Sequence, residues 1–166
     1  MRKLVGLLGL TLLLALPAAA QETPKAEVFL GGSYIRSDGA NFRGWNGSVS
    51  GNLNDWFGIV GDFSGHYYPL VNGHIYTFTF GPQFSYRKNA RVTPFVRALL
   101  GGARVGGGGV SDTSFAANVG GGVDIKVSDS FAIRAIQADA LITRFGGSTS
   151  TDARLSVGIV LRFGKK

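Results

Sequence analysis

The sequence predicts an all-β fold, an eight-stranded antiparallel up-and-down β-barrel that crosses a membrane. Apolar and polar residues alternate with a period of two along many segments, which is typical of strands with two different faces. These segments run for about 11–14 residues, which is long for a globular sheet but suits tilted strands in a bilayer. The connections alternate between short turns and longer segments rich in Gly, Ser or Pro, as in membrane barrels.

The first 20 residues predict a secretory signal peptide. Arg2 and Lys3 form a basic start, an apolar run follows to Leu16, and Ala18 to Ala20 resemble a small-residue cleavage site. The alternative, a membrane anchor helix, needs about 20 apolar residues, and this run is shorter. We therefore expect 1–20 to be removed and 21–166 to form a single barrel domain.

Composition excludes several classes of function. The chain has no cysteine, so disulfides, thiolate metal sites and cysteine nucleophiles are absent. The net charge of +7 falls to +5 without Arg2 and Lys3, and the basic residues are scattered, so nucleic acid is not an expected partner. The glycine-rich segment 101–109 lacks the Gly-Lys-Ser/Thr ending of a phosphate-binding loop. We expect no cofactor and no metal site.

The first four predicted strands are 26–36, 42–52, 56–67 and 74–86. Each has one apolar or aromatic face and one small or polar face, and a turn-like Leu-Asn-Asp separates the second from the third. The alternation is clearest in the fourth strand, where every second residue is bulky: His74, Tyr76, Phe78, Phe80, Pro82, Phe84 and Tyr86.

The last four predicted strands are 92–105, 114–127, 131–142 and 153–163. A short turn at 128–130 joins the sixth to the seventh. We expect the glycine-rich segment 106–112 to be a flexible loop, and 143–152 to be the longest loop of the chain.

Volume decides which face of the barrel meets the membrane. The interior of an eight-stranded barrel is just filled by side chains or holds one small ligand. The aromatic residues would overfill that space, so we expect the bulky face to contact lipid and the polar face to line the lumen. The lipid-facing set includes Phe57, Phe63, Phe78, Phe80 and Phe84. The alternative is a soluble, lipocalin-like barrel with the apolar face inside.

The polar faces carry isolated charges of both signs, which predicts a paired network that closes the lumen. The expected members are Asp62, Arg97, Asp124, Lys126, Arg134, Arg154 and Arg162. Positive residues outnumber acids in this set, so any residual path would favour anions. Strand 131–142 breaks the alternation, because Arg134 has one parity and Gln137 and Asp139 the other. Either a β-bulge returns all three to the lumen, or Asp139 lies high at the outer interface.

The sequence offers little catalytic chemistry. Asp62, Ser64 and His66 share a strand face, but neighbours at this spacing lie about 7 Å apart, too far for direct hydrogen bonds. We therefore expect no enzyme activity. A lipid-modifying hydrolase of the membrane is the least favoured alternative.

Four stretches resemble the small outer-membrane β-barrel family, the OmpA-like and porin-like eight-stranded domains. They are NLNDWFGIVGDFSG (52–65), VTPFVRALLGG (92–102), GGGVDIKVSDSFAIRAIQADAL (120–141) and the ending SVGIVLRF (156–163). The ending resembles the family's assembly signal at Ser156, Gly158, Leu161 and Phe163, although Gly164, Lys165 and Lys166 follow where relatives usually stop.

This resemblance implies an integral protein of the outer membrane of a Gram-negative-type cell, with 21–166 as an outer-membrane barrel domain. We expect a monomer whose partners are outer-membrane lipid and the barrel assembly machinery, with an unknown ligand for the outer loops. The expected role is structural support or surface contact through those loops. A narrow passive pore for small solutes or anions is the alternative.

Overall fold

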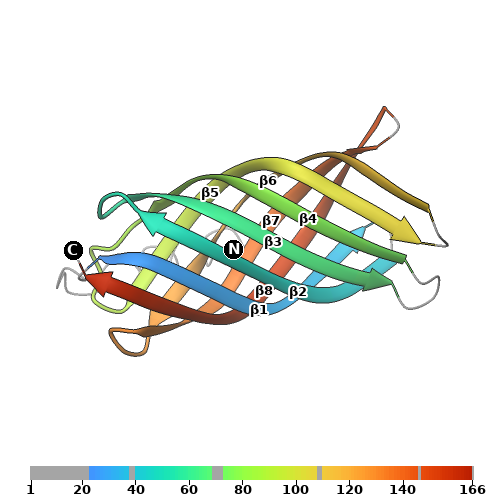
Figure 1. The fold of residues 1–166 in the computed structure, drawn as a ribbon. Helices are drawn as coiled ribbons and strands as arrows, with labels where there is room; N and C mark the ends of the chain where they lie inside the picture. Colours follow the sequence, from blue (N-terminus) through green and yellow to red (C-terminus); the bar gives the residue numbers. More distant parts are fainter. Residues whose placement is uncertain (1–22, 38–39, 69–72, 108–109, 146, 166) are drawn as a thin grey trace, which may run out of the picture.

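The chain folds as a closed antiparallel barrel, as the sequence predicts (Figure 1). The computed structural model describes residues 23–37, 40–68, 73–107, 110–145 and 147–165. The predicted signal peptide, 1–20, lies outside these residues. Among the residues that the structure describes, no helix is long and apolar enough to cross a membrane.

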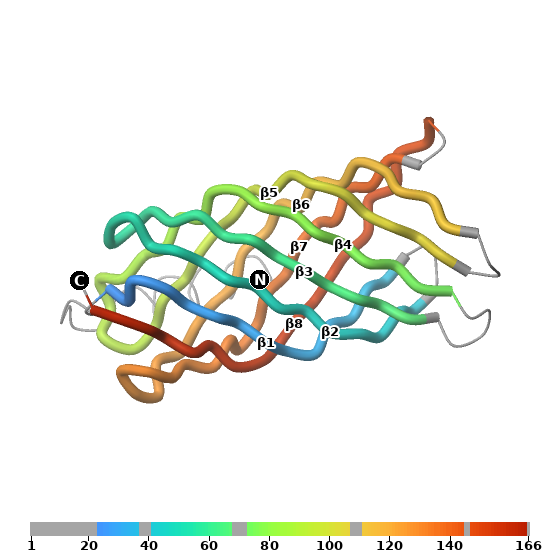
Figure 2. Tube along the Cα trace, in the orientation of Figure 1, coloured from blue at the N-terminus to red at the C-terminus, as the bar shows by residue number. Residues whose placement is uncertain are grey.

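Eight strands follow one another around the barrel in chain order, and β1 closes it by pairing with β8. They are β1 (Pro24–Ser37), β2 (Ala40–Asn52), β3 (Phe57–Tyr68), β4 (Gly73–Ser85), β5 (Val92–Gly107), β6 (Val110–Lys126), β7 (Phe131–Phe145) and β8 (Ser148–Lys165). We call the end where β1 begins and β8 ends the terminal end, and the opposite end the far end. Figure 2 traces the tilted strands between the two ends.

The longer far-end strands correct one expectation. The predicted loops at 106–112 and 143–152 are mostly strand: β5 reaches Gly107 and β6 begins at Val110, while β7 reaches Phe145 and β8 begins at Ser148. Val105 pairs with Asp112, and Thr143 pairs with Ser150. Antiparallel pairing satisfies backbone groups that a loop would leave to water, so these polar segments continue as hairpins. The β7–β8 hairpin projects beyond the rim (Figure 1).

Burial follows the predicted period of two. In β8 exposed and buried residues alternate from Thr151 to Leu161, broken only at the half-buried Gly158, and the buried members point into the lumen. Phe63, Phe78 and Phe80 are exposed on the outer face, Phe80 at 69%. A belt of exposed apolar side chains therefore surrounds a mostly polar interior, which is the arrangement that lipid requires.

A β-bulge in β7 resolves the conflict at Arg134. Arg134 pairs with Gly158 and Gln137 with Ser156, so Ala135 and Ile136 together oppose Val157. Ala135 and Ile136 are both exposed, whereas Arg134, Gln137 and Asp139 are buried. The first alternative, a bulge that returns all three to the lumen, is the one that the structure has.

Candidate functional site

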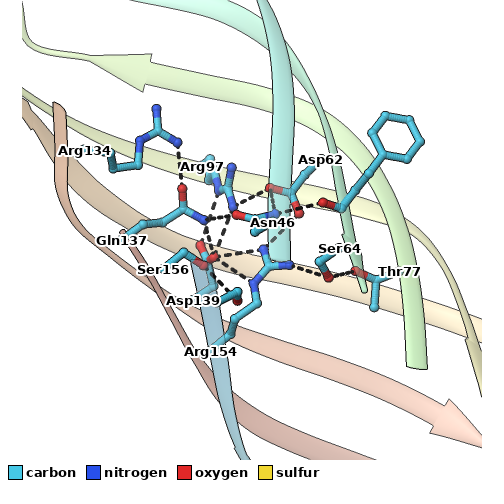
Figure 3. Close-up of polar contacts among 12 residues, drawn as sticks. Asn46, Asp62, Ser64, Thr77, Arg97, Arg134, Gln137, Asp139, Arg154 and Ser156 are labelled. Atoms are coloured by element: carbon cyan, nitrogen blue, oxygen red, sulfur yellow. Dashed lines mark hydrogen bonds and ion pairs between the residues drawn. The ribbon is translucent and has the colours of Figure 1, made fainter. Parts of the chain in front are cut away.

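The centre of the lumen holds two arginines and two aspartates in a closed arrangement (Figure 3). Arg97 Nη2 lies 2.8 Å from Asp62 Oδ2 and 3.0 Å from Asp139 Oδ2. Arg154 Nη2 lies 3.0 Å from Asp62 Oδ1 and 2.9 Å from Asp139 Oδ2. All four side chains are 0% exposed. Each cation therefore meets both anions, which offsets the cost of removing four charges from water.

Neutral side chains from other strands complete this central cluster. Asn46 donates from Nδ2 to Asp62 Oδ2 at 3.0 Å, and Gln137 donates from Nε2 to Asp139 Oδ2 at 2.7 Å. Gln137 also donates to Asn46 Oδ1 at 3.2 Å, so the two amides join the two carboxylates across the barrel. Such a network becomes rigid when its members are satisfied.

A second layer lies nearer the terminal end and is built on Arg134. Its guanidinium donates to both carboxylate oxygens of Asp124, at 2.7 and 2.9 Å, and to Gln137 Oε1 at 2.7 Å. The same guanidinium lies 4.4 Å from the centroid of the Phe29 ring and 4.3 Å from that of Phe95. Two aromatic faces and one bidentate carboxylate thus hold this cation.

A third layer lies at the terminal end. Glu27 receives Arg87 Nη2 at 2.7 Å and Arg162 Nε at 3.2 Å, and Asn52 Nδ2 donates to Glu27 Oε2 at 2.9 Å. These four side chains come from β1, β2, β8 and the β4–β5 connection. The layer lies between the Arg134 layer and the solvent at this end.

The Asp62, Ser64 and His66 alternative does not form a catalytic relay. His66 Nε2 lies 2.9 Å from Ser33 Oγ rather than from Ser64. Ser64 bonds to Thr77 at 2.6 Å and accepts from Arg154 at 3.1 Å, while Asp62 bonds to the central cluster. Within the described residues, no group of three or more His, Asp or Glu side chains is arranged to hold a metal ion.

The predicted lumen residues are therefore divided among layers. Asp62, Arg97 and Arg154 meet in the central cluster; Asp124 with Arg134, and Arg162, lie in the two layers nearer the terminal end.

Lys126 does not join the lumen network that the sequence predicts for it. It pairs with Asp129 at 2.7 Å in the β6–β7 turn, and its side chain is 24% exposed, because the barrel ends there and water reaches the ammonium group. The hydrogen bond from Lys126 lowers the pKa of Asp129 below its ordinary value.

Sequence reasoning missed Glu27 and Arg87, and it left Asp139 undecided. The signal was present for Glu27, which shares the parity of the buried Phe29 and Ser33. Arg87 lies beyond the end of β4, where strand parity no longer predicts direction. Asp139 balances the central cluster, which has two arginines and two aspartates. Glu27 adds a further negative charge to the lumen, so its excess of positive charge is much smaller than the sequence predicts.

The residues of the expected assembly signal lie on β8. Leu161 and Phe163 are exposed on the outer face, at 41% and 51%, and Ser156 is buried at 1%. Leu161 pairs with Val28 and with Phe131, so the end of β8 lies at the seam where the barrel closes.

The fold and its exposed apolar belt define a membrane-spanning β-barrel. Residues 6–163 match the family described as the outer membrane protein beta-barrel domain. The chain belongs to this family, and its place is the outer membrane of a Gram-negative-type cell. No curated protein matches it.

Solved barrels show the same fold at low identity. Neisserial surface protein A is 18% identical with a TM-score of 0.59, over 83% of this chain and 96% of that one. The N-terminal barrel domain of Pseudomonas aeruginosa OprF is 16% identical with a TM-score of 0.57, over 86% and 100%. Ail, the attachment invasion locus protein of Yersinia pestis, is 21% identical with a TM-score of 0.51, over 86% and 99%.

Proposed function

We propose that this protein is a closed, non-catalytic barrel that supports the outer membrane and contacts external surfaces through its far-end hairpins. The observation that carries the proposal is the central cluster, in which Asp62, Arg97, Asp139 and Arg154 fill the lumen with no exposed surface. A buried, doubly paired set of this kind supports a lumen without a continuous water path for an ion. Far-end strands that extend past the rim supply the surface for contact.

The proposal places the far end outside the cell and the turns of the terminal end in the periplasm. The protein acts as a monomer in lipid, and the barrel assembly machinery inserts it by way of the end of β8. Ail is described as an attachment invasion locus protein, and Neisserial surface protein A as a surface protein. Those descriptions support, by analogy of fold alone, a surface role for this chain.

Ion flux into proteoliposomes tests the closed lumen. Vesicles loaded with a chloride-sensitive dye and containing the intact protein should quench no faster than empty vesicles. The Asp62→Ala, Asp139→Ala double variant should leak chloride if it folds, because both anions that bind Arg97 and Arg154 are gone and the remaining cations attract chloride. Rapid quenching with the intact protein would contradict the closed lumen.

A narrow pore is the second candidate, favoured by one observation. Several lumen polar atoms have no hydrogen-bond partner: Arg97 Nη1, Thr79 Oγ1 and both side-chain polar atoms of Asn118. Buried polar atoms of this kind are usually satisfied by water, so they favour some hydration at the central cluster and on its far-end side. Isolated waters do not make a path, and the paired charges of the central cluster favour closure.

Catalysis ranks third. The Ser33–His66 contact has no carboxylate on the other ring nitrogen, since His66 Nδ1 has no partner. A triad needs that third group to orient the imidazole. His66 is also 0% exposed and faces the lumen, away from lipid substrates.

A further inference from the structure

We propose that the far end of the barrel carries a binding site for a lipid phosphate, formed by Arg36 on β1 and Arg43 on β2. Both side chains are exposed and share the outward parity of the lipid-facing belt. The proposal concerns the outer wall, so it does not depend on whether the lumen conducts.

Strand register places the two arginines at opposite corners of one small patch. Arg36 pairs with Asn41, and Tyr34 pairs with Arg43, so Arg36 and Arg43 are diagonal neighbours. Such neighbours lie about 7–8 Å apart at the backbone, within reach of long side chains. The Tyr34 hydroxyl donates to Asn41 Oδ1 at 2.5 Å along the other diagonal. This bond holds the middle of the patch and leaves the Asn41 amide group as a further donor.

The part of the outer wall that the structure describes offers no acid to balance these cations. Among the described strand residues of outward parity, none is acidic. The outward cations at the far end are Arg36, Arg43, Arg104 and Arg144. Like charges on one strand face repel unless an anion lies between them, so the patch is complementary to a bound anion.

The position of the patch selects lipid as the source of that anion. Trp45 lies two residues from Arg43 on the same face of β2, and Arg43 pairs on its other side with Tyr67. Tyr67 and Tyr76 form an edge-to-face pair with their hydroxyls 3.1 Å apart. Aromatic girdles lie at headgroup level, so Arg36 and Arg43 lie where lipid phosphates are found.

Guanidinium groups suit this ligand. Each forms parallel hydrogen bonds to two phosphate oxygens, and two arginines flanking one phosphate neutralise most of its charge. Each arginine or lysine near an anionic membrane surface strengthens the binding of anionic lipid about fivefold. We therefore expect the pair to enrich phosphate-monoester lipids over zwitterionic ones at this point of the wall.

The two tryptophans allow a direct test, because Trp45 lies beside the patch and Trp56 lies at the terminal end. The Trp56→Phe variant reports on the patch alone, and the Trp45→Phe variant on the opposite end. Each is refolded into phosphatidylcholine vesicles containing phosphatidic acid, with either lipid brominated in its acyl chains. The ratio of quenching by the two brominated lipids measures local enrichment of the anionic lipid.

Trp45 should show a higher ratio than a variant that also carries Arg36→Gln and Arg43→Gln, by about fivefold for each arginine. Arg36→Lys with Arg43→Lys should retain part of the enrichment, which separates loss of charge from loss of fold. Lys88→Gln with Arg91→Gln, exposed cations of the terminal end, should leave the Trp45 ratio unchanged.

Two results would overturn the proposal. An unchanged Trp45 ratio in the double glutamine variant would mean that the arginines recruit no lipid. Equal quenching of Trp45 by the two brominated lipids, together with binding of soluble inositol hexaphosphate that the double glutamine variant loses, would assign the patch to a soluble polyanion. Enrichment that disappears at high salt would support the lipid site.

Discussion

Arg97 and Asp139 meet across a strand that separates them, because the residue between them has no side chain. Arg97 pairs with Gly120 on β6, and Gly120 pairs with Asp139 on β7. Arg97 donates from Nε to Asp139 Oδ1 at 3.3 Å and from Nη2 to Oδ2 at 3.0 Å. A Cβ atom at Gly120 would clash with the Asp139 carboxylate and the Ala138 carbonyl oxygen. The central cluster therefore depends on Gly120, which takes no part in the ion pairs but leaves room for Arg97 to reach Asp139.

Gly120→Val should destabilise the barrel by about 3–5 kcal/mol, because it separates one partner from a buried ion pair. Urea unfolding in lipid vesicles measures the change in the free energy of unfolding. Gly32→Ala is the matched control, since a Cβ there meets no heavy atom within 4 Å. Equal stability of the two variants would contradict the role assigned to Gly120.

Deletion of Ala135 should leave the barrel able to fold. The residue is the extra one in the β7 bulge, so its loss gives Arg134, Gln137 and Asp139 the same parity and keeps their pairs with Asp124 and Arg97. Folded and boiled protein migrate differently on detergent gels when a barrel is closed, and this deletion should retain the shift. Deletion of Ala138, which lies outside the bulge, should abolish the shift, because it would turn either Gln137 or Asp139 toward lipid; loss of the shift in the Ala135 deletion would contradict the account of the bulge.

Phe80→Arg should cost about 2–4 kcal/mol, because Phe80 is the most exposed aromatic residue of the outer face and lies in the middle of β4. Thr79→Arg points inward, where Thr79 is 3% exposed, and should act by crowding the lumen. Lipid-borne quenchers should quench a tryptophan introduced at 78, 80 or 84 strongly, and at 77, 79 or 83 weakly. The reverse pattern would support a lipocalin-like barrel.

Phe163→Ala should sharply lower the amount of folded protein in the outer membrane. The side chain is 51% exposed at the end of β8, where an assembly factor can reach it, and it lies two residues after Leu161 on the same face. Lys166→Ala, beyond the described residues, should change the yield little. Comparable yields of folded protein for Phe163→Ala and Lys166→Ala would show that Phe163 is not part of an assembly signal.

The sequence predicts the barrel well because its period of two is set by the strand itself. Asp62, Arg97 and Arg154 could be assigned to the lumen by parity alone, and all three are there. Parity fails where the backbone departs from regular pleating, as at the Ala135 bulge, and where a strand ends, as at Lys126. It also says nothing about which charges meet across the barrel, since that depends on shear and on room left by residues such as Gly120.

The far-end hairpins show a second limit of sequence patterns. Glycine, serine and threonine in 143–152 predict a loop, yet Thr143 pairs with Ser150 and Leu141 with Asp152. Local propensity is weak in these segments, and pairing with the neighbouring strand decides their conformation. Similarly, nothing local distinguishes Arg36 and Arg43 from other surface arginines until the register makes them diagonal neighbours.

Single-channel recording in a planar bilayer tests most directly whether the central cluster closes the lumen. Purified, refolded intact protein should give negligible conductance, or small events with at most a slight preference for anions, because Asp62 and Asp139 neutralise Arg97 and Arg154 where the lumen is filled. Arg97→Ala together with Arg134→Ala should widen the path and weaken folding at once, since each removes a partner of a buried carboxylate. A large, stable, ohmic conductance from the intact protein would contradict the closed lumen and establish the pore.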